Sequence, residues 1–260
     1  MEILKPALLL LGLALIFAIL LGVLAKKLHV DRDPRIDAVR ALLSGANCGA
    51  CGEAGCDAFA TGLIEGRCKL ASCNPTSKEN KEKIAELLGV NNDGEETMVK
   101  VFCSGGNACG DKYEYQGYGN CKSMELLSGG RKACVVGCMG MGSCVDACNF
   151  SSIEVNTNGF AEVNNGKCTN CGACINACPK KLIRRIPKSA KVMVACSNHN
   201  KGREVSSICK AGCIGCGLCV KTCKYGAIVM DNNLAVIDYT KCTGCLECVA
   251  KCPTKVIKAL

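Results

Sequence analysis

The chain has 260 residues, of which 26 are cysteine, and it contains no tryptophan and only 4% aromatic residues. So few aromatic side chains argue against a large conventional core, and this cysteine content is typical of disulfide scaffolds or metal proteins. The formal net charge of +9 counts every thiol as neutral. Metal-bound thiolates would offset that charge, so it does not by itself indicate a nucleic-acid partner.

An apolar run without a charge lies at the N-terminus, where residues 7–25 read "ALLLLGLALIFAILLGVLA". A helix of this length can cross the hydrocarbon layer of a membrane, whereas the apolar part of a secretory signal is shorter. Only Lys5 precedes the run, and the basic residues that follow it are Lys26, Lys27, Arg32 and Arg35. This bias predicts a single-pass anchor over residues 1–28, with the bulk of the chain in the reducing cytoplasm, where thiols bind metal and do not pair.

Residues 29–90 contain the first cysteine group and are predicted to form a small helical module. Apolar spacing predicts one helix that ends at Gly45, "DAFATGLIEG" predicts a second, and a third is bounded by Thr76 or Ser77 and by Gly89. The predicted ligands of a first 4Fe-4S cluster are Cys48, Cys51, Cys56 and Cys73. Cys68, also in this module, is predicted to be an ordinary free thiol.

Residues 212–260 hold two regular cysteine runs, "GCIGCGLCVKTC" and "KCTGCLECVAKCP". In bacterial two-cluster ferredoxins, the first three cysteines of one run bind one cluster, and the fourth binds the other. The predicted sets are Cys213, Cys216, Cys219 and Cys252 for one 4Fe-4S cluster, and Cys223, Cys242, Cys245 and Cys248 for the second. Short strands on either side of the turn "DNN" complete the unit.

Residues 133–187 repeat this arrangement with one change, because Met141 stands where the middle cysteine of the first run is expected. Iron-sulfur cores bind thiolate, so Cys134, four residues before Cys138, is the predicted substitute. The predicted sets are Cys134, Cys138, Cys144 and Cys178 for one 4Fe-4S cluster, and Cys148, Cys168, Cys171 and Cys174 for the other. A hairpin with the turn "TNG" is expected between the runs.

Two connecting segments, residues 91–132 and 188–211, contain most of the cysteines that these sets leave over. The sequences "VKVFCSGG" and "AKVMVACSN" predict two similar strands that each deliver a thiol at their end. Spacing leaves two interpretations open, a sixth cluster or a group of structural thiols, for Cys103, Cys121, Cys196 and Cys209. Five 4Fe-4S clusters are therefore predicted. Their negative charge with thiolates bound offsets the +9, and no nucleic-acid partner is expected.

The order of these motifs resembles the B subunit of the Rnf complex, the ion-translocating ferredoxin:NAD⁺ oxidoreductase of bacterial membranes. The resemblance rests on the apolar span, "NCGACGEAGCDAF", "ACVVGCMGMGSCVDAC" and the two ferredoxin pairs. It implies an iron-sulfur electron-relay subunit in the bacterial inner (cytoplasmic) membrane, which exchanges electrons with reduced ferredoxin or flavodoxin. It also implies partner subunits, in the membrane and the cytoplasm, that hold the flavins and the nicotinamide site, and coupling to Na⁺ or H⁺ transport. Unlike many members, the chain has proline after only two of the four runs, at Pro179 and Pro253.

The expected fold class is α+β, with an N-terminal transmembrane helix, a small helical 4Fe-4S module and two bacterial ferredoxin-like two-cluster units. No complete active site is predicted in this chain, since "GCMGMGS" does not join a strand to a helix as a dinucleotide fingerprint does. The alternatives are an electron-feeding subunit of another membrane oxidoreductase and a protein whose clusters serve structure only. Lysines that flank the runs either steer an acidic ferredoxin or are ordinary surface charges: Lys167, Lys180, Lys181, Lys221, Lys251 and Lys255.

Overall fold

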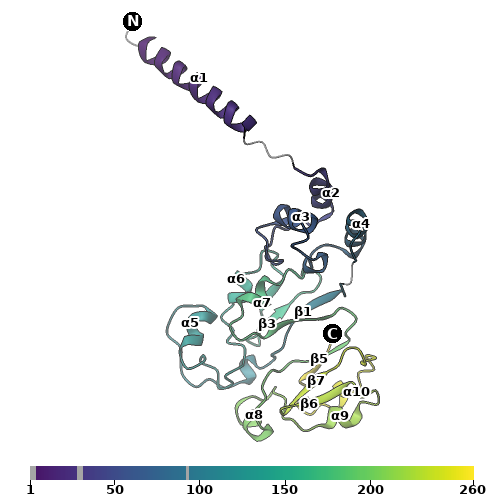
Figure 1. Ribbon diagram of the computed structural model, residues 1–260. Coiled ribbons are helices and arrows are strands. Elements are labelled where there is room, and N and C mark those ends of the chain that lie inside the picture. The colour runs from purple at the N-terminus through teal and green to yellow at the C-terminus, as the bar shows by residue number, and fades with distance from the viewer. Residues whose placement is uncertain (1–3, 28–31, 92–93) are drawn as a thin grey trace.

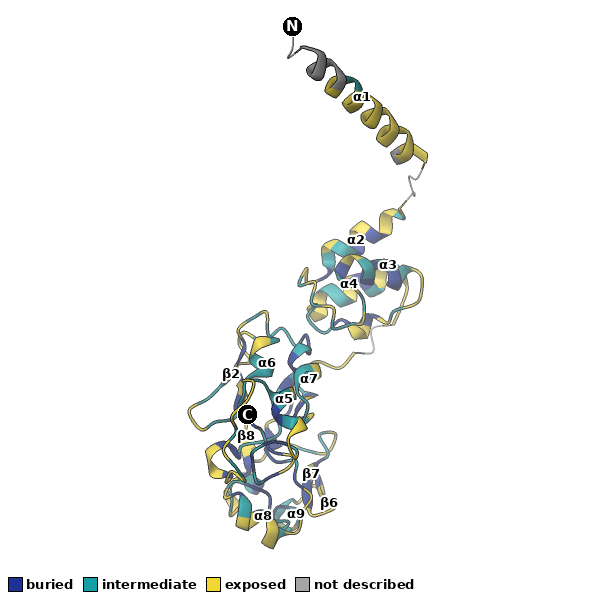
Figure 2. Cartoon of the chain, turned by 90° about the vertical axis from the view of Figure 1, so that its left-hand side faces the viewer, coloured by how far each residue is buried: buried dark blue, intermediate teal, exposed yellow. Residues whose placement is uncertain are grey.

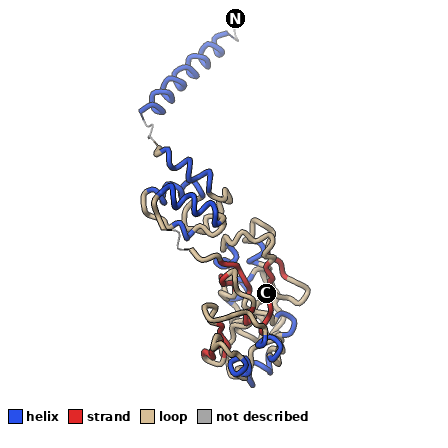
Figure 3. Tube along the Cα trace, turned by 90° about the vertical axis from the view of Figure 1, so that its right-hand side faces the viewer, coloured by secondary structure: helices blue, strands red, loops and turns tan. Residues whose placement is uncertain are grey.

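The structure, a computed structural model, describes residues 4–27, 32–91 and 94–260, with helices prevailing in the N-terminal part and the described strands all in the C-terminal part, among loops and short helices (Figure 3). The predicted boundary between residues 28 and 29 lies outside the described residues. The helices are α1 (Leu4–Lys27), α2 (Pro34–Leu42), α3 (Cys56–Ile64), α4 (Lys78–Leu88), α5 (Cys121–Leu126), α6 (Ser143–Asp146), α7 (Ala173–Ala177), α8 (Gly202–Ile208), α9 (Leu218–Thr222) and α10 (Glu247–Lys251), with 3₁₀ turns η1 (Leu70–Ser72) and η2 (Gly106–Ala108). The strands are β1 (Thr97–Val101), β2 (Ile153–Val155), β3 (Ala161–Val163), β4 (Ile183–Pro187), β5 (Val192–Val194), β6 (Ile228–Asp231), β7 (Leu234–Ile237) and β8 (Ile257–Ala259).

Helix α1 extends away from the rest of the chain (Figure 1). The burial of its side chains is described for residues 10–24, 26 and 27, and the large apolar ones among them are exposed, as Figure 2 shows. In the ranges that the structure describes, no helix combines the length and the apolar character that a membrane span requires. The predicted transmembrane anchor is therefore not confirmed.

The N-terminal module consists of α2, α3 and α4 around its own small core. Asp33 caps α2 by accepting a hydrogen bond from the backbone of Arg35, and Ser77 caps α4 in the same way. Gly89 ends α4 in the left-handed conformation, with φ of 64°. The buried side chains of the module include Val39, Phe59 and Ile84. The three helices that the sequence predicted here are confirmed.

Two units of the same topology follow, each built from two antiparallel strand pairs. In the first, β1 pairs with β4 and β2 with β3; in the second, β5 pairs with β8 and β6 with β7. Each has its own apolar core, around Val99 and Ile183 in the first and around Val192 and Ile257 in the second. The mixed helix-and-strand class and both predicted hairpins are confirmed.

The outer strands β1 and β5 lie in segments that the sequence analysis treated as connections. Strand β1, within residues 91–132, pairs with β4, with Thr97 opposite Pro187 at one end and Val101 opposite Ile183 at the other. Strand β5, within residues 188–211, pairs with β8. Both units therefore begin before residues 133 and 212, since a buried outer strand completes each sheet.

Phe59 is the first test of this description, because it is one of the largest fully buried side chains and lies on α3 in the module core. Its replacement by alanine should lower the opening free energy of residues 34–88 by about 3–5 kcal/mol. Native-state hydrogen exchange of the full chain, followed by mass spectrometry, measures this locally. Leu87→Ala, at a residue 44% exposed on α4, is the control and should change little. Unchanged protection in Phe59→Ala would contradict the described core.

Candidate metal centres

The second two-strand-pair unit contains two cavities of about 330 Å³, each lined by four cysteines. Short helices α9 and α10 begin after residues of positive φ, Gly217 and Leu246, and each contributes one buried cysteine. The first cavity is lined by Cys213, Cys216, Cys219 and Cys252. The second is lined by Cys223, Cys242, Cys245 and Cys248. Each cavity thus takes its fourth cysteine from the other run.

In the first unit, the four cysteines of one predicted set lie close enough for the neighbouring thiols to affect the pKa of Cys174. Burial, together with the neighbouring thiols of Cys168, Cys171 and Cys148, raises the pKa of the Cys174 thiol to about 11. Ser152, which is buried, donates its backbone N–H to Cys148 Sγ at 3.5 Å, and its hydroxyl lies 3.2 Å from the same sulfur. This side chain was not singled out from the sequence, because nothing in its spacing marks it as a partner of sulfur.

The other site of the first unit differs from the predicted set at one position. A cavity of about 410 Å³ is lined by Cys121, Cys138, Cys144 and Cys178. The backbone N–H of Cys121, the first residue of α5, donates to the Ser143 hydroxyl at 2.8 Å, which holds α5 against the start of α6. Cys134, the predicted substitute for the missing thiol, lies in a different cavity. The structure therefore brings Cys121, and not Cys134, together with Cys138, Cys144 and Cys178 at this cavity.

The signal that could have pointed away from Cys134 is present in the second unit. There Cys209 stands four residues before Cys213, in "CKAGC", just as Cys134 stands four residues before Cys138, in "CVVGC". The second unit has a full complement of cysteines in its run, so the extra upstream cysteine is not a substitute there. By the same repeat, Cys134 does not replace the thiol missing at Met141.

The N-terminal module brings its cysteines to the start of α3. Burial raises the pKa of Cys73, and the thiols of Cys56 and Cys51 act in the same direction. The Asn47 side chain accepts a hydrogen bond from the Cys56 backbone N–H at 2.9 Å, which closes the loop that carries Cys48 onto α3. Cys73 Sγ lies 3.1 Å from the Thr76 hydroxyl.

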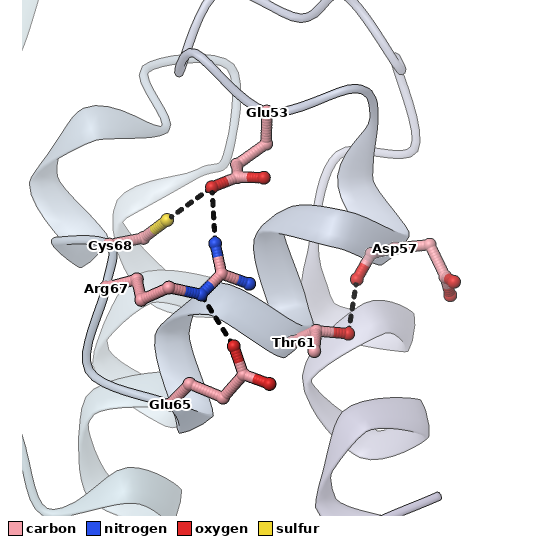
Figure 4. A network of polar contacts seen from close by, with 6 residues as sticks. All are labelled: Glu53, Asp57, Thr61, Glu65, Arg67 and Cys68. Carbon is pink, nitrogen blue, oxygen red and sulfur yellow. Dashed lines mark hydrogen bonds and ion pairs between the residues drawn. The ribbon is translucent and has the colours of Figure 1, made fainter. Parts of the chain in front are cut away.

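Cys68 makes a different kind of contact, shown in Figure 4. Its thiol donates to Glu53 Oε1 at 3.2 Å, and Arg67 bridges Glu53 and Glu65. Burial and the hydrogen bond to Glu53 raise the pKa of Cys68, so the thiol stays protonated at neutral pH. This environment agrees with an ordinary free thiol.

A fourth cavity, of about 390 Å³, lies between the two strand-pair units. Its walls come from the segments after β1 and β5, from the segment before α6 and from the end of α8. Besides Cys138, the cysteines that line it are Cys103, Cys109, Cys134, Cys196 and Cys209. Of the four residues named for a sixth site from the sequence, Cys103, Cys196 and Cys209 meet here, and Cys121 does not.

The cysteine cavities fit iron-sulfur clusters and not disulfides. All 26 cysteines are free thiols. Within the described residues, no three His, Cys, Asp or Glu side chains converge as they would on a single metal ion. Burial, together with neighbouring thiols, raises the pKa of Cys144 to about 12 and that of Cys219 to about 11. Several thiolates in one apolar cavity therefore require a cationic core between them.

Family profiles match three parts of the chain. A profile described as "Putative Fe-S cluster" matches residues 43–75, and two described as "4Fe-4S dicluster domain" match residues 167–228 and 212–256. The match over residues 167–228 joins the last run of the first unit to the first run of the second, whereas the cavities pair runs within each unit. Together with the cavities, these matches define the chain as a 4Fe-4S protein with several clusters.

Curated relatives extend the similarity to almost the whole chain. The B subunit of the ion-translocating oxidoreductase complex of Methanosarcina acetivorans is 42% identical over 95% of this chain and 94% of its own length. The B subunit of the Na⁺-translocating ferredoxin:NAD⁺ oxidoreductase complex of Acetobacterium woodii is 40% identical over 94% and 74%. The proton-translocating counterpart of Clostridium ljungdahlii is 39% identical over 95% and 89%. The chain belongs to the family of Rnf complex B subunits.

Replacement of Cys121 tests whether this residue is a cluster ligand together with Cys138, Cys144 and Cys178. Cys121→Ala should lower the iron and acid-labile sulfide content of the anaerobically purified chain by about one cluster, four atoms of each, because the site loses one of its four thiolates. Cys68→Ala is the matched control and should leave both counts unchanged. Full iron content in Cys121→Ala would overturn the assignment of Cys121.

Replacement of Ser152 tests whether its hydrogen bond to Cys148 raises the reduction potential of the neighbouring cluster. A hydrogen bond to sulfur stabilises the more negative, reduced state, so Ser152→Ala should lower the reduction potential of the cluster held by Cys148. A loss of about 1.4 kcal/mol corresponds to about 60 mV for one electron. A redox titration followed by electron paramagnetic resonance measures the shift. Ser206→Ala, whose exposed hydroxyl donates to the Arg203 carbonyl, should cause none, and an equal potential in both variants would contradict the prediction.

Proposed function

We propose that this chain is the membrane-anchored electron-relay subunit of an ion-translocating ferredoxin:NAD⁺ oxidoreductase and exchanges electrons with ferredoxin. One observation carries the proposal. Two units, each with cysteines for two clusters, lie in a chain that is similar over almost its whole length to such B subunits. When bound, 4Fe-4S clusters supply one-electron transfer. Flavin and nicotinamide chemistry belongs to partner subunits of the complex.

Five clusters are proposed, each with four thiolates from this chain. The ligand sets are Cys48, Cys51, Cys56 and Cys73; Cys121, Cys138, Cys144 and Cys178; Cys148, Cys168, Cys171 and Cys174; Cys213, Cys216, Cys219 and Cys252; and Cys223, Cys242, Cys245 and Cys248. The cavity linings and the mutual effects of the thiols on their pKa values support these sets.

Helix α1 is the proposed membrane anchor of the bacterial inner membrane, with the iron-sulfur modules in the cytoplasm. Two observations support it. The described large apolar side chains of α1 are exposed, for example Ile16 and Leu21 at 63% each, and Lys26 and Lys27 close the helix on the side of the modules. The proposal uses the sequence of the whole run, residues 7–25, part of whose side chains lie outside the described set.

The second ferredoxin-like unit is the proposed contact surface for ferredoxin. Among the cysteines, all of which are described, Cys216 and Cys245 alone are exposed, so the two sites of this unit lie nearest to solvent. Lys221 and Lys251, at the ends of α9 and α10, are exposed beside them and would attract an acidic partner. Lys180 is not part of such a surface, since its side chain is 7% exposed and its ammonium group lies 2.5 Å from Glu125 Oε2.

The test is reduction of the anaerobically purified chain by reduced ferredoxin, followed by stopped-flow absorbance. The wild type should be reduced, and Lys221→Glu with Lys251→Glu should slow the second-order rate about tenfold at low salt, with the difference vanishing near 1 M salt. Lys69→Glu with Lys122→Glu, at exposed lysines elsewhere, is the control of equal charge. A chain that reduced ferredoxin cannot reduce would overturn the function, and equal rates in both double variants would overturn the contact surface alone.

A further inference from the structure

The five proposed ligand sets leave six cysteines, and five of these line the one cavity between the two ferredoxin-like units: Cys103, Cys109, Cys134, Cys196 and Cys209. The sixth, Cys68, lies in the N-terminal module and bonds to Glu53. Cys109, Cys134, Cys196 and Cys209 are each less than 10% exposed. Five thiols at one cavity, four of them buried and with no disulfide among them, form a cluster of side chains that the ferredoxin repeat does not explain.

Four of the five thiols occupy equivalent places in the two units. Cys103 follows β1 by two residues, and Cys196 follows β5 by two residues. Cys134 and Cys209 each stand four residues before the first cysteine of a ferredoxin run, at Cys138 and Cys213 respectively. The cavity thus receives the same two thiols from each unit. Cys109 has no counterpart in this repeat.

Hydrogen bonds to sulfur follow the same repeat. The backbone N–H of Gly105 donates to Cys103 Sγ at 3.5 Å, and that of Asn198 donates to Cys196 Sγ at 3.5 Å, in both cases from two residues further on. The first ligand of each neighbouring cluster makes a second bond: Cys138 N–H to Cys103 Sγ at 3.3 Å and Cys213 N–H to Cys196 Sγ at 3.4 Å. Amide groups directed at sulfur in this way stabilise thiolates and are typical of cluster ligands.

The segments that carry these thiols also bond to each other across the units. Ser104 N–H donates to the Ala195 carbonyl at 3.0 Å, and the Ser197 hydroxyl donates to the Phe102 carbonyl at 3.0 Å. These residues flank Cys103 and Cys196. The buried Asn198 donates its side-chain amide to Cys134 Sγ at 3.4 Å, from one unit to the thiol of the other.

Cys109 is bound differently. Its backbone pairs with that of Cys209 in an isolated antiparallel bridge, and its thiol donates to the Gly110 carbonyl at 3.6 Å. A thiol that keeps its proton in such a hydrogen bond is not a cluster ligand, because clusters bind thiolates. Cys209 belongs to the repeat, and Cys109 does not.

We propose that Cys103, Cys134, Cys196 and Cys209 form a sixth 4Fe-4S site, two ligands from each ferredoxin-like unit, and that Cys109 lies outside its ligand set. The site lies between the units and is tied by one amide-to-sulfur hydrogen bond to the first ligand of a cluster in each. This proposal rests on the proposed function, because the same chain holds the other five clusters. With the sixth site, the cysteine sites form a continuous series through both units.

The experiment is a count of iron and acid-labile sulfide, with ⁵⁷Fe Mössbauer spectroscopy, on the full chain purified anaerobically. Wild type should hold about 24 iron atoms, and Cys134→Ser and Cys209→Ser about 20 each. Cys109→Ser, a buried thiol of the same cavity, is the matched control and should keep about 24. Serine is close in size to cysteine, and Cys196→Ala supplies a second variant if one of these fails to fold.

The double variant Cys121→Ser with Cys134→Ser separates the new site from the neighbouring one. If the two residues serve different clusters, about eight iron atoms are lost; if they serve the same cluster, only about four are lost, and the sixth site is overturned. Wild type with about 20 atoms also overturns it, and loss of iron in Cys109→Ser overturns the ligand set. Because ferredoxin reduction of the wild type is measured separately, failure of the sixth site does not resemble failure of the proposed function.

Discussion

Grouped thiols in apolar cavities are the constraint on which the rest of the structure depends. Within the described residues, the apolar cores are small, and cysteines are members of each of them. A buried thiolate next to others is unfavourable, as the raised pKa values of Cys144 and Cys174 indicate. A bound cluster supplies both the compensating charge and the missing interior, so metal binding and folding of these units are expected to be coupled.

The arrangement of the cavities also explains how a short chain can hold many centres without a large core. Within each ferredoxin-like unit, the fourth cysteine of each run lies with the first three cysteines of the other run. This exchange ties the two ends of the unit together. The outer strands β1 and β5 do the same between units, because the residues that follow them bond across the interface. The N-terminal module keeps a separate helical core, and its proposed ligands come from the loop before α3, the first residue of α3 and the residue after η1.

Much of this fold could be predicted from cysteine spacing, since a run such as Cys213 to Cys223 determines both its local loop and its exchange partner. The helices of the N-terminal module were also predictable, because Ser77 and Gly89 mark the ends of α4. The place of Cys121 beside Cys138, Cys144 and Cys178 was not, since a residue that comes from a separate segment leaves no spacing to read. Ser152, Asn198 and the burial of Lys180 depend on tertiary contacts. The outer strands β1 and β5 were predicted from "VKVFCSGG" and "AKVMVACSN", but their pairing with β4 and β8 was not, because it joins segments far apart in the sequence.

The most direct test of the central claim is amide hydrogen exchange of the chain before and after anaerobic removal of iron with a chelator under reducing conditions, which keep the thiols reduced. If the cysteine cavities organise the fold around clusters, protection in β1 to β8 should be lost together with the iron, and the visible absorbance should disappear in parallel. Strands that keep their full protection in iron-free, disulfide-free protein would contradict the account.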